Sequence, residues 1–297
     1  MLVVPVDVSF QGINGLISSY WIDSIEPAIL DPGPSTSLEG LRKSLEDLGV
    51  KFSDIRHVLV THVHLDHAGG VGHLISENPG MQVHVHPEAV SHLVDPRRLV
   101  ESTRRTFGDS HDRLWGEVLP IDLDRVCIWD SPTKCPVPNI RSFATPGHVG
   151  HHVSYLEEMD GCFLAGDALG AIFTKGAPVY PPTPPPGVDV ALWLDSLEEV
   201  EEIQAENFGI AHFGVHSDFE MRVSEMRERL IAFRDRVYAW MNQPRGFDRE
   251  LFEKEIRQEM SKHLPKKDVD SYFDIFSPSA DWDGMQFYLE RRHLGNS

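Results

Sequence analysis

Short apolar segments bounded by turn residues mark the beginning of the chain. Leu2–Val8, Ile17–Ile22 and Pro27–Leu30 are rich in β-branched and aromatic residues, and glycines separate the first two. The third runs into the sequence Asp31-Pro-Gly-Pro34. Apolar runs that end in glycine and proline in this way predict three short β-strands.

An amphipathic helix is predicted after this turn. It begins at Thr36 or Ser37 and ends at Leu48, and Gly49 is the residue that stops it. Leucines at helical spacing form its apolar face: Leu38, Leu41, Leu45 and Leu48.

Strands and helices continue to alternate up to about residue 165. Residues 87–107 have a mostly helical pattern, which Asp95-Pro96 interrupts because proline cannot continue a helix. The apolar runs that predict strands are His57–Thr61, Met81–His86, Val126–Trp129, Ile140–Ala144, His152–Leu156 and Cys162–Ala165. Such alternation is typical of mixed α/β proteins.

The composition changes at Ala177–Gly187, a segment with six prolines. So much proline rules out a helix interior or a central strand and predicts a stiff, extended loop. The loop is either a spacer or a wall over a site, and its aromatic residue Tyr180 suits a partly apolar pocket. A helix follows, with Asp189 as its predicted cap. The apolar face of this helix carries Trp193, Leu197, Val200 and Ile203.

After His216 the pattern becomes purely helical. Residues 217–220 spell a capping box, in which a serine precedes a glutamate by three positions. A long apolar stripe at helical spacing follows: Phe219, Val223, Met226, Leu230, Phe233, Val237 and Trp240. Further helices are expected at Phe247–Leu264, Val269–Phe276 and Gly284–Leu294. We therefore divide the chain into a chemical domain, residues 1–216, and a helical extension packed on it, residues 217–297.

The net charge argues against some classes of function. The chain has 297 residues, and 27 Lys and Arg against 46 Asp and Glu give a formal charge of −19. This balance argues against a general binder of nucleic acids or membrane surfaces, which needs basic patches.

The first ten residues, the lengths of the apolar runs and the cysteine content indicate in which cellular compartment to expect the protein. Residues 1–10 do not resemble a signal peptide, and the chain has no apolar run of membrane-spanning length. The three cysteines are too few and too scattered for a disulfide framework. We therefore expect a cytoplasmic protein with a small-molecule substrate and no nucleic-acid or membrane partner. The sequence does not give the oligomeric state.

Histidine is abundant, with 16 residues, and four potential metal ligands fall within six positions. His62 and His64 follow an apolar strand, and in an extended segment alternate side chains point to the same side. Asp66 and His67 come from the turn where a helix begins, and so approach from another angle. Imidazole suits zinc, iron, nickel or copper, and the carboxylate admits harder ions. This cluster predicts a metal site at a strand end.

Three later residues stand in the same kind of position. His148, Asp167 and His212 each come just after a short apolar run and lie close to a glycine. Glycine allows the tight turn that such a position needs. Taken one by one, these residues have ordinary structural explanations, but together with the first cluster they predict one shared site.

At this point the motifs resemble those of a known family. The pattern H-x-H-x-D-H, followed by PGH, AGD and a last histidine, is similar to that of the metallo-β-lactamase superfamily over about residues 10–216. The resemblance implies a four-layer αβ/βα sandwich, with the metals in a cleft at the strand ends. Carried over by motif, one metal would be held by His62, His64 and His148, and the other by Asp66, His67 and His212. Asp167 would bridge the two metals.

Other histidines have weaker claims on the site. His152 falls where many members carry a second histidine, which more often supports a ligand than acts as one. His151 stands where many members have glycine, and the role considered for it is a hydrogen bond that supports a ligand. For His84, His86 and His216 we expect structural or surface roles.

Departures from the family pattern reduce the number of reactions that the resemblance allows. No cysteine lies where true β-lactamases of this fold place one, and His64 stands where flavin-linked di-iron members place a carboxylate. The resemblance therefore favours the glyoxalase II, lactonase and thioesterase branch. A dinuclear-metal-bound hydroxide would cleave an ester, thioester or lactone of a small molecule, with Asp66 as a catalytic residue that orients the nucleophile.

Several alternatives remain open. The same hydroxide attacks phosphorus, so a small-molecule phosphodiesterase is the second hypothesis. A metal-binding regulatory protein with vestigial hydrolase activity is a third, and an iron oxidoreductase is the least favoured. Zinc is the first choice of metal, with iron or manganese as alternatives. The substrate-binding residues are unknown at this stage.

Overall fold

Two β-sheets form the centre of the computed structural model, which describes residues 2–129, 135, 137–243 and 247–295. The first sheet has the strand order β1-β2-β3-β4-β5-β6. Its first two pairs are antiparallel and the next three are parallel. The strands are β1 (Val3–Asp7), β2 (Ser18–Ile22), β3 (Ala28–Leu30), β4 (His57–Leu59), β5 (Gln82–Val85) and β6 (Val126–Ile128).

The second sheet has the order β11-β10-β9-β8-β7. Its pair of β9 and β10 is parallel, and its other three pairs are antiparallel. The strands are β7 (Ile140–Ala144), β8 (Val153–Glu157), β9 (Cys162–Gly166), β10 (Asn207–Ile210) and β11 (Gly214–His216). The predicted strand runs are confirmed in both sheets, with ends that differ by one or two residues.

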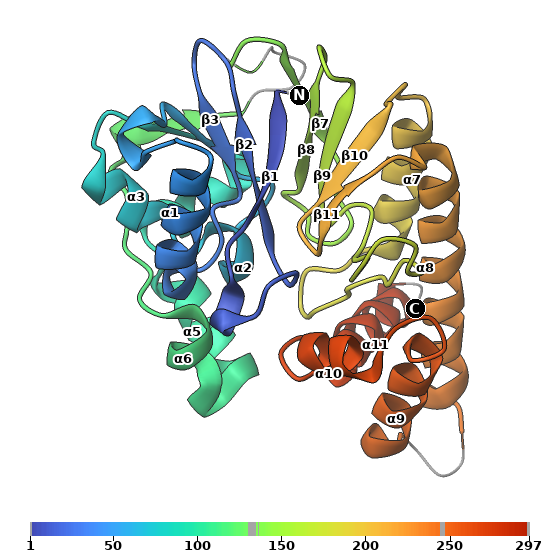
Figure 1. The fold of residues 1–297 in the computed structure, drawn as a ribbon. Coiled ribbons are helices and arrows are strands. Elements are labelled where there is room, and N and C mark those ends of the chain that lie inside the picture. Colours follow the sequence, from blue (N-terminus) through green and yellow to red (C-terminus); the bar gives the residue numbers. More distant parts are fainter. Residues whose placement is uncertain (1, 130–134, 136, 244–246, 296–297) are drawn as a thin grey trace.

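Helices cover the outer face of each sheet, so that the layers follow the order helix, sheet, sheet, helix (Figure 1). The helices of the first half are α1 (Leu38–Asp47), α2 (Leu65–Ala68), α3 (Val71–Glu77), α4 (Val90–Val94), α5 (Arg97–Phe107) and α6 (His111–Trp115). Helix α7 (Val190–Glu201) lies on the second sheet (Figure 1). This arrangement confirms the expected four-layer αβ/βα sandwich.

Alternation along the strands explains the two layers of apolar packing. In β4, Val58 joins the large core beneath the helices, whereas Leu59 joins a smaller core with Tyr155 and Leu164 of the other sheet. Successive side chains of a strand point to opposite faces, so each strand serves both layers. Burial of apolar surface on both faces stabilises the sandwich.

Four helices form the C-terminal region: α8 (Phe219–Met241), α9 (Arg249–Met260), α10 (Lys266–Phe273) and α11 (Pro278–Gly295). The predicted stripe of α8 is confirmed, because its members from Phe219 to Val237 are buried. Helix α8 packs along the second sheet beside α7, and α9, α10 and α11 gather below the open ends of the sheets (Figure 1). The division at residue 216 stays a prediction.

Two local predictions are wrong. Leu48 is 46% exposed, because α1 ends at Asp47 and the chain turns away at Gly49, which has a φ of +79°. The capping box before α8 does not form, and the side chain of Asp218 accepts a hydrogen bond from Arg222 Nε at 2.8 Å instead. By contrast, the Asp189 side chain caps α7 as predicted, because it accepts hydrogen bonds from two backbone N–H groups of the first turn.

None of the helices described here combines the length and the apolar character needed to cross a membrane.

Candidate metal centre

The loops at one end of both sheets carry all seven predicted ligands. His62 and His64 lie between β4 and α2, and Asp66 and His67 belong to α2 itself. Three further loops of the second sheet bring His148, after β7, Asp167, directly after β9, and His212, between β10 and β11. The structure therefore brings together residues that are up to 150 positions apart in the sequence.

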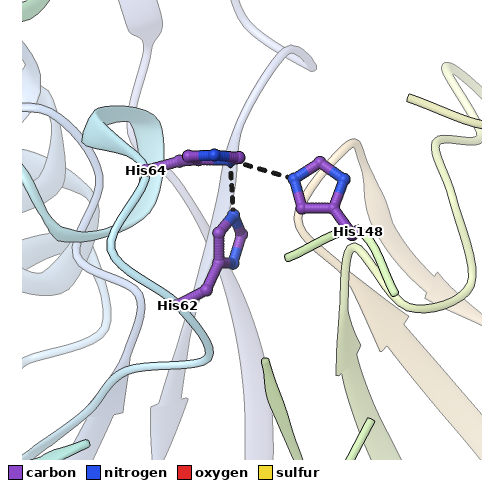
Figure 2. Close-up of side chains that lie close together, drawn as sticks. All are labelled: His62, His64 and His148. Carbon is purple, nitrogen blue, oxygen red and sulfur yellow. Dashed lines mark hydrogen bonds between the residues drawn. The ribbon is translucent and has the colours of Figure 1, made fainter. Parts of the chain in front are cut away.

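Three histidines meet in a first cluster (Figure 2). His64 Nδ1 lies 2.9 Å from His62 Nε2 and 2.9 Å from His148 Nε2. His64 Nδ1 can carry only one hydrogen, and this hydrogen can be donated to only one of the two neighbouring nitrogen atoms. The lone pairs of the remaining nitrogen atoms therefore converge at this point. Such convergence of imidazole nitrogen atoms is the donor arrangement of a transition-metal site.

Backbone carbonyl groups orient two of the candidate ligand histidines. The Nδ1–H of His148 donates to the carbonyl oxygen of Pro182, and that of His212 donates to the carbonyl oxygen of Leu16, each at 3.0 Å. These bonds leave the Nε2 lone pairs free to face the centre. A hydrogen bond on the far nitrogen is the usual way in which proteins fix a metal-ligating histidine.

A second cluster consists of Asp66, His67 and His212, whose ligand atoms lie within 4.8 Å of one another. Asp66 Oδ2 is 3.5 Å from His67 Nε2 and 3.3 Å from His212 Nε2. Asp167 lies between the clusters, since its Oδ2 is 3.3 Å from His148 Nε2 and 3.5 Å from His67 Nε2. This position is where a carboxylate that bridges two cations would stand.

The sequence interpretation missed Asp31, which supports the centre from behind. Its carboxylate is 2.9 Å from His67 Nδ1 and accepts hydrogen bonds from the backbone N–H and the hydroxyl of Thr61. The Thr61 hydroxyl is itself 3.0 Å from His62 Nδ1. Asp31 follows β3 just as the ligands follow their strands, so the same signal was available, but we interpreted it only as part of a turn.

The electrostatics of the centre favour a positive charge. Burial alone would lower the pKa of His67, but the carboxylates of Asp167, Asp66 and Asp31 raise this pKa well above its ordinary value. For Asp66, burial works to raise the pKa, yet the charges of His67 and His212 hold it at about 2. A divalent cation would supply the positive charge that these carboxylates require.

Two unpaired atoms support the same conclusion. His67 Nε2 and Asp167 Oδ1 are buried and have no hydrogen-bond partner among the described residues. Buried polar atoms without a partner are costly, and a metal ion would satisfy both of them. The residues present therefore fit a centre for divalent metal ions.

His152 lies beside the centre and supports Asp167. Its Nε2 accepts a hydrogen bond from the backbone N–H of Asp167 at 3.2 Å, and its Nδ1 is 2.8 Å from the hydroxyl of Thr145. Gly166 has a φ of +55°, and a Cβ there would come within 2.8 Å of both His152 and Thr61. The glycine before Asp167 is thus required both by its backbone angle and by this close packing.

The remaining histidines lie outside the metal-ligand groups of the described chain. His84 Nε2 contacts His57 Nδ1 at 2.9 Å, and the ring of His86 stacks on Trp129. The ring of His216 stacks on Phe208. His151 Nε2 accepts a long hydrogen bond, 3.4 Å, from the backbone N–H of Val63.

A cleft of about 550 Å³ opens at the centre. His64 and Asp66 are partly exposed to it, whereas the other five candidate ligands are buried. Most of its walls are apolar, with contributions from α5, α6, the proline-rich loop and the helices α10 and α11. The apolar lining includes Leu99, Phe107, Trp115, Pro182, Pro184, Pro185, Pro186, Tyr272, Ile275, Phe276 and Ala280.

The proline-rich loop is therefore a wall of the cleft rather than a plain spacer. Tyr180 itself does not line this cleft, because its side chain is buried behind the loop and its hydroxyl donates to Asp281 Oδ2 at 2.6 Å. Asp281 also accepts a hydrogen bond from the backbone N–H of Thr183. Burial raises the pKa of Asp281 to about 7. This residue of α11 fixes the loop to the C-terminal region.

The sandwich fold and the seven clustered donors define a metallo-hydrolase. The sequence matches the metallo-beta-lactamase superfamily over residues 13–212, so the chain belongs to this superfamily. The resemblance seen in the motifs is thereby confirmed.

Known structures agree with this assignment. The metallo-beta-lactamase family protein TTHA1429 from Thermus thermophilus has a similar fold, with a TM-score of 0.69 and 21% identity over 99% of this chain and 93% of the other. ST1585 from Sulfolobus tokodaii superposes with a TM-score of 0.63 and 22% identity over 91% of this chain and 98% of the other.

Sequence comparison adds two relatives. The same ST1585, a metallo-beta-lactamase fold-containing protein from Sulfurisphaera tokodaii, is 28% identical over 183 residues, which are 60% of this chain and 67% of the relative. A protein named thioesterase pkgB, from Emericella nidulans, is 28% identical over 166 residues, 55% of this chain. The match spans only 37% of the length of that thioesterase.

Proposed function

We propose that this metallo-hydrolase cleaves an ester, thioester or lactone bond of a small molecule that carries an apolar group. The observation that carries the proposal is the donor cluster at the base of a cleft of about 550 Å³ with mostly apolar walls. The name of the thioesterase relative favours the thioester within this group of bonds.

We assign two divalent ions to the centre, with zinc as the first choice. His62, His64 and His148 would hold one ion, and Asp66, His67 and His212 the other, with Asp167 between them. Five imidazoles and two carboxylates suit zinc and also admit iron or manganese. When bound, such ions lower the pKa of a water molecule and polarise the bond to be cleaved.

Within this centre, Asp66 faces the substrate. It is the one carboxylate among the seven candidate ligands that is partly exposed to the cleft. Its oxygen atoms would orient the attacking water. Asp167 is buried and held through its backbone by His152, so it positions the centre rather than contacting the substrate.

The walls select the substrate and exclude water. Phe107 and Phe276 are partly exposed and offer apolar surface to an acyl group, and burial of such a group contributes binding free energy in proportion to the apolar area. The prolines of the loop form a stiff side of the cleft at little entropic cost. An apolar acyl group would also shield the reacting bond from bulk water.

The test is a substrate panel on the purified protein after elemental analysis and reconstitution with zinc, iron or manganese. We expect turnover of benzoyl thioesters or aryl lactones, and at least about a hundredfold lower activity in a His148→Ala variant. Higher activity on bis(p-nitrophenyl) phosphate than on every acyl substrate would replace this proposal with a phosphodiesterase. Absence of turnover from the whole panel, with metal bound, would contradict hydrolysis and favour a regulatory role.

The small-molecule partner and the cytoplasmic location are further parts of this proposal, which rest on the acidic charge and the cysteine content of the sequence.

A further inference from the structure

A second hollow, an open groove of about 710 Å³, lies next to the metal cleft. One side is formed by residues near the beginning of the chain and in α6, and the other by α10 and the residues that follow it. Its lining consists of Gln11, Ile13, Arg113, Lys266, Lys267, Asp270, Ser271, Asp274 and Ile275. Neither the expected ligands nor the motifs of the sequence account for this groove.

The acidic side chains of the groove have ion-pair partners, whereas its basic side chains have none among the described residues. Its two carboxylates are engaged, because Asp270 and Asp274 lie 3.2 and 3.0 Å from the guanidinium group of Arg257. Its three cations, Arg113, Lys266 and Lys267, form no ion pair with a carboxylate of the described residues. In a chain with a net charge of −19, three exposed cations without carboxylate partners in one hollow leave a locally positive site.

The arginine of the groove is held in place. Arg113 Nη1 donates to the side-chain oxygen of Gln11 at 2.9 Å, and Gln11 Nε2 donates back to the carbonyl oxygen of Arg113 at 2.9 Å. This reciprocal pair fixes the arginine while its remaining N–H groups stay available. A fixed guanidinium group beside flexible lysines suits carboxylate or phosphate oxygens.

The groove and the cleft are neighbours. Ile275 lines both of them. The next residue, Phe276, belongs to a group of three aromatic rings: Phe10 stacks on Trp115 with ring centroids 5.4 Å apart, and Phe276 contacts both. The ring of Phe276 is in turn 4.9 Å from that of the candidate ligand His212. The two hollows therefore adjoin at Ile275.

We propose that this groove binds an anionic group, a carboxylate or a phosphate, at the end of the substrate remote from the bond that is cleaved. The inference rests on the proposed function, because it assumes that the reacting bond lies at the metal centre. The substrate is then a molecule of two parts, with an apolar acyl group in the cleft and an anionic leaving group that extends over Ile275 into the groove. For a thioester, the anion belongs to the thiol.

Direct binding tests the groove without turnover. The probes are desulfo-coenzyme A, which carries phosphates, and S-methylglutathione, which carries carboxylates, and neither has a free thiol to bind a metal. Isothermal titration of the metal-loaded protein should detect at least one probe, with an affinity that falls as salt rises. The Lys266→Gln/Lys267→Gln variant and the Arg113→Gln variant should each bind at least about tenfold more weakly. A Lys266→Arg/Lys267→Arg variant should retain binding.

The matched control removes two lysines from another part of the surface, in a Lys43→Gln/Lys51→Gln variant. Lys43 belongs to α1 and Lys51 follows it, and neither lines the groove. This variant has the same net charge as the groove double variant, so equal weakening in both would show an effect of total charge and overturn the proposal. Failure of both probes to bind the wild-type protein would also overturn it.

Kinetics add a second measurement. Benzoyl thioesters of N-acetylcysteamine, glutathione and coenzyme A share an acyl group but differ in the charge of the thiol. The groove variants should raise KM for an anionic thioester about tenfold, with kcat unchanged and no effect on the neutral one. A preference for the coenzyme A or the glutathione ester distinguishes phosphate from carboxylate. Binding of a probe without turnover of any ester, thioester or lactone would refute the proposed function and leave the groove, whereas turnover without charge preference would refute the groove alone.

Discussion

Two groups of closely spaced histidines among the described residues differ in what surrounds them. At the metal centre, His64 Nδ1 lies 2.9 Å from His62 Nε2, and in the first sheet His84 Nε2 lies at the same distance from His57 Nδ1. Around the centre, carboxylates approach from several sides. Near the pair in the sheet stands the carboxylate of Glu26, 3.5 Å from the far nitrogen of His57.

The comparison shows that clustering of histidines alone does not define a metal site. In the sheet, one hydrogen bond between the two rings satisfies both of the facing nitrogens. In the centre, carbonyl groups and Asp31 take up the hydrogens on the far nitrogens, so that free lone pairs face one another and two carboxylates. The partners behind the histidines therefore distinguish the candidate metal site from the pair in the sheet as much as the histidines themselves do.

The largest expected effect is on metal binding and catalysis, and it distinguishes the histidines of the candidate metal centre from the histidine pair in the sheet. A His64→Ala change should remove metal from the centre and lower kcat/KM by about a thousandfold or more, because the metals supply the activated water. A His84→Gln change should leave metal content and kcat/KM within about threefold of wild type. Elemental analysis and steady-state kinetics measure both. Loss of metal in the His84 variant would contradict the distinction between the candidate metal ligands and the histidine pair in the sheet.

The next effect tests the partners behind the ligands. An Asp31→Asn change removes the negative charge 2.9 Å from His67 Nδ1 while it keeps the shape of the side chain. Affinity for the metal should fall by about 10- to 100-fold. Competition with a chelator of known affinity measures this loss. Unchanged affinity would show that Asp31 only stabilises the turn.

The pair of His57 and His84 in the first sheet should make the free energy of unfolding depend on pH. Burial lowers the pKa of His84 from 6.5 to about 3, and the nearby His57 contributes to this decrease. The folded state thus disfavours the proton, so this contribution to stability is complete above pH 6.5 and is lost as pH falls toward 3. Between about pH 7 and pH 5 the wild type should lose about 2 kcal/mol more of its free energy of unfolding than the His84→Gln variant. Urea unfolding at both pH values measures the difference, and parallel losses would contradict the assignment.

The smallest effect concerns His151, which stands next to the centre but belongs to neither group. Its ring accepts the long hydrogen bond, 3.4 Å, from the backbone of Val63, and a contact of this length is weak. A His151→Ala change should therefore alter kcat/KM by less than about threefold. A much larger decrease, with metal content unchanged, would reveal a role in substrate binding.

Much of the centre could be predicted because its ligands follow a local rule. Each one comes shortly after a strand, in or beside a tight turn, and apolar runs and glycines mark such places in a sequence. Asp31 obeys the same rule, but one aspartate before Pro-Gly-Pro is also a common turn sequence, and no motif distinguishes the two. The side-chain cap of α7 was predicted correctly for a similar reason, since an N-cap depends on few neighbouring residues.

The capping box predicted before α8 does not form. Asp218 is bound to Arg222, and Arg222 also donates to the carbonyl oxygen of Ala177 in the proline-rich segment. Tyr180 lies behind the loop because its hydroxyl donates to a buried carboxylate of α11. The distant partners of Arg222 and Tyr180 in these contacts, Ala177 and Asp281, lie 45 and 101 positions away along the chain.

Local patterns in the amino-acid sequence were enough to predict most of the strands and helices, though not β11 or α6, together with the seven candidate ligands and most of the apolar helix positions, because periodicity and turn chemistry act over a few residues. Folding in three dimensions settled which carbonyl groups and carboxylates orient the histidines, that α10 and α11 close the metal cleft, and that three cations gather beside it. These features depend on contacts between segments far apart in the chain. Packing of the whole fold sets such contacts, and no local pattern records them.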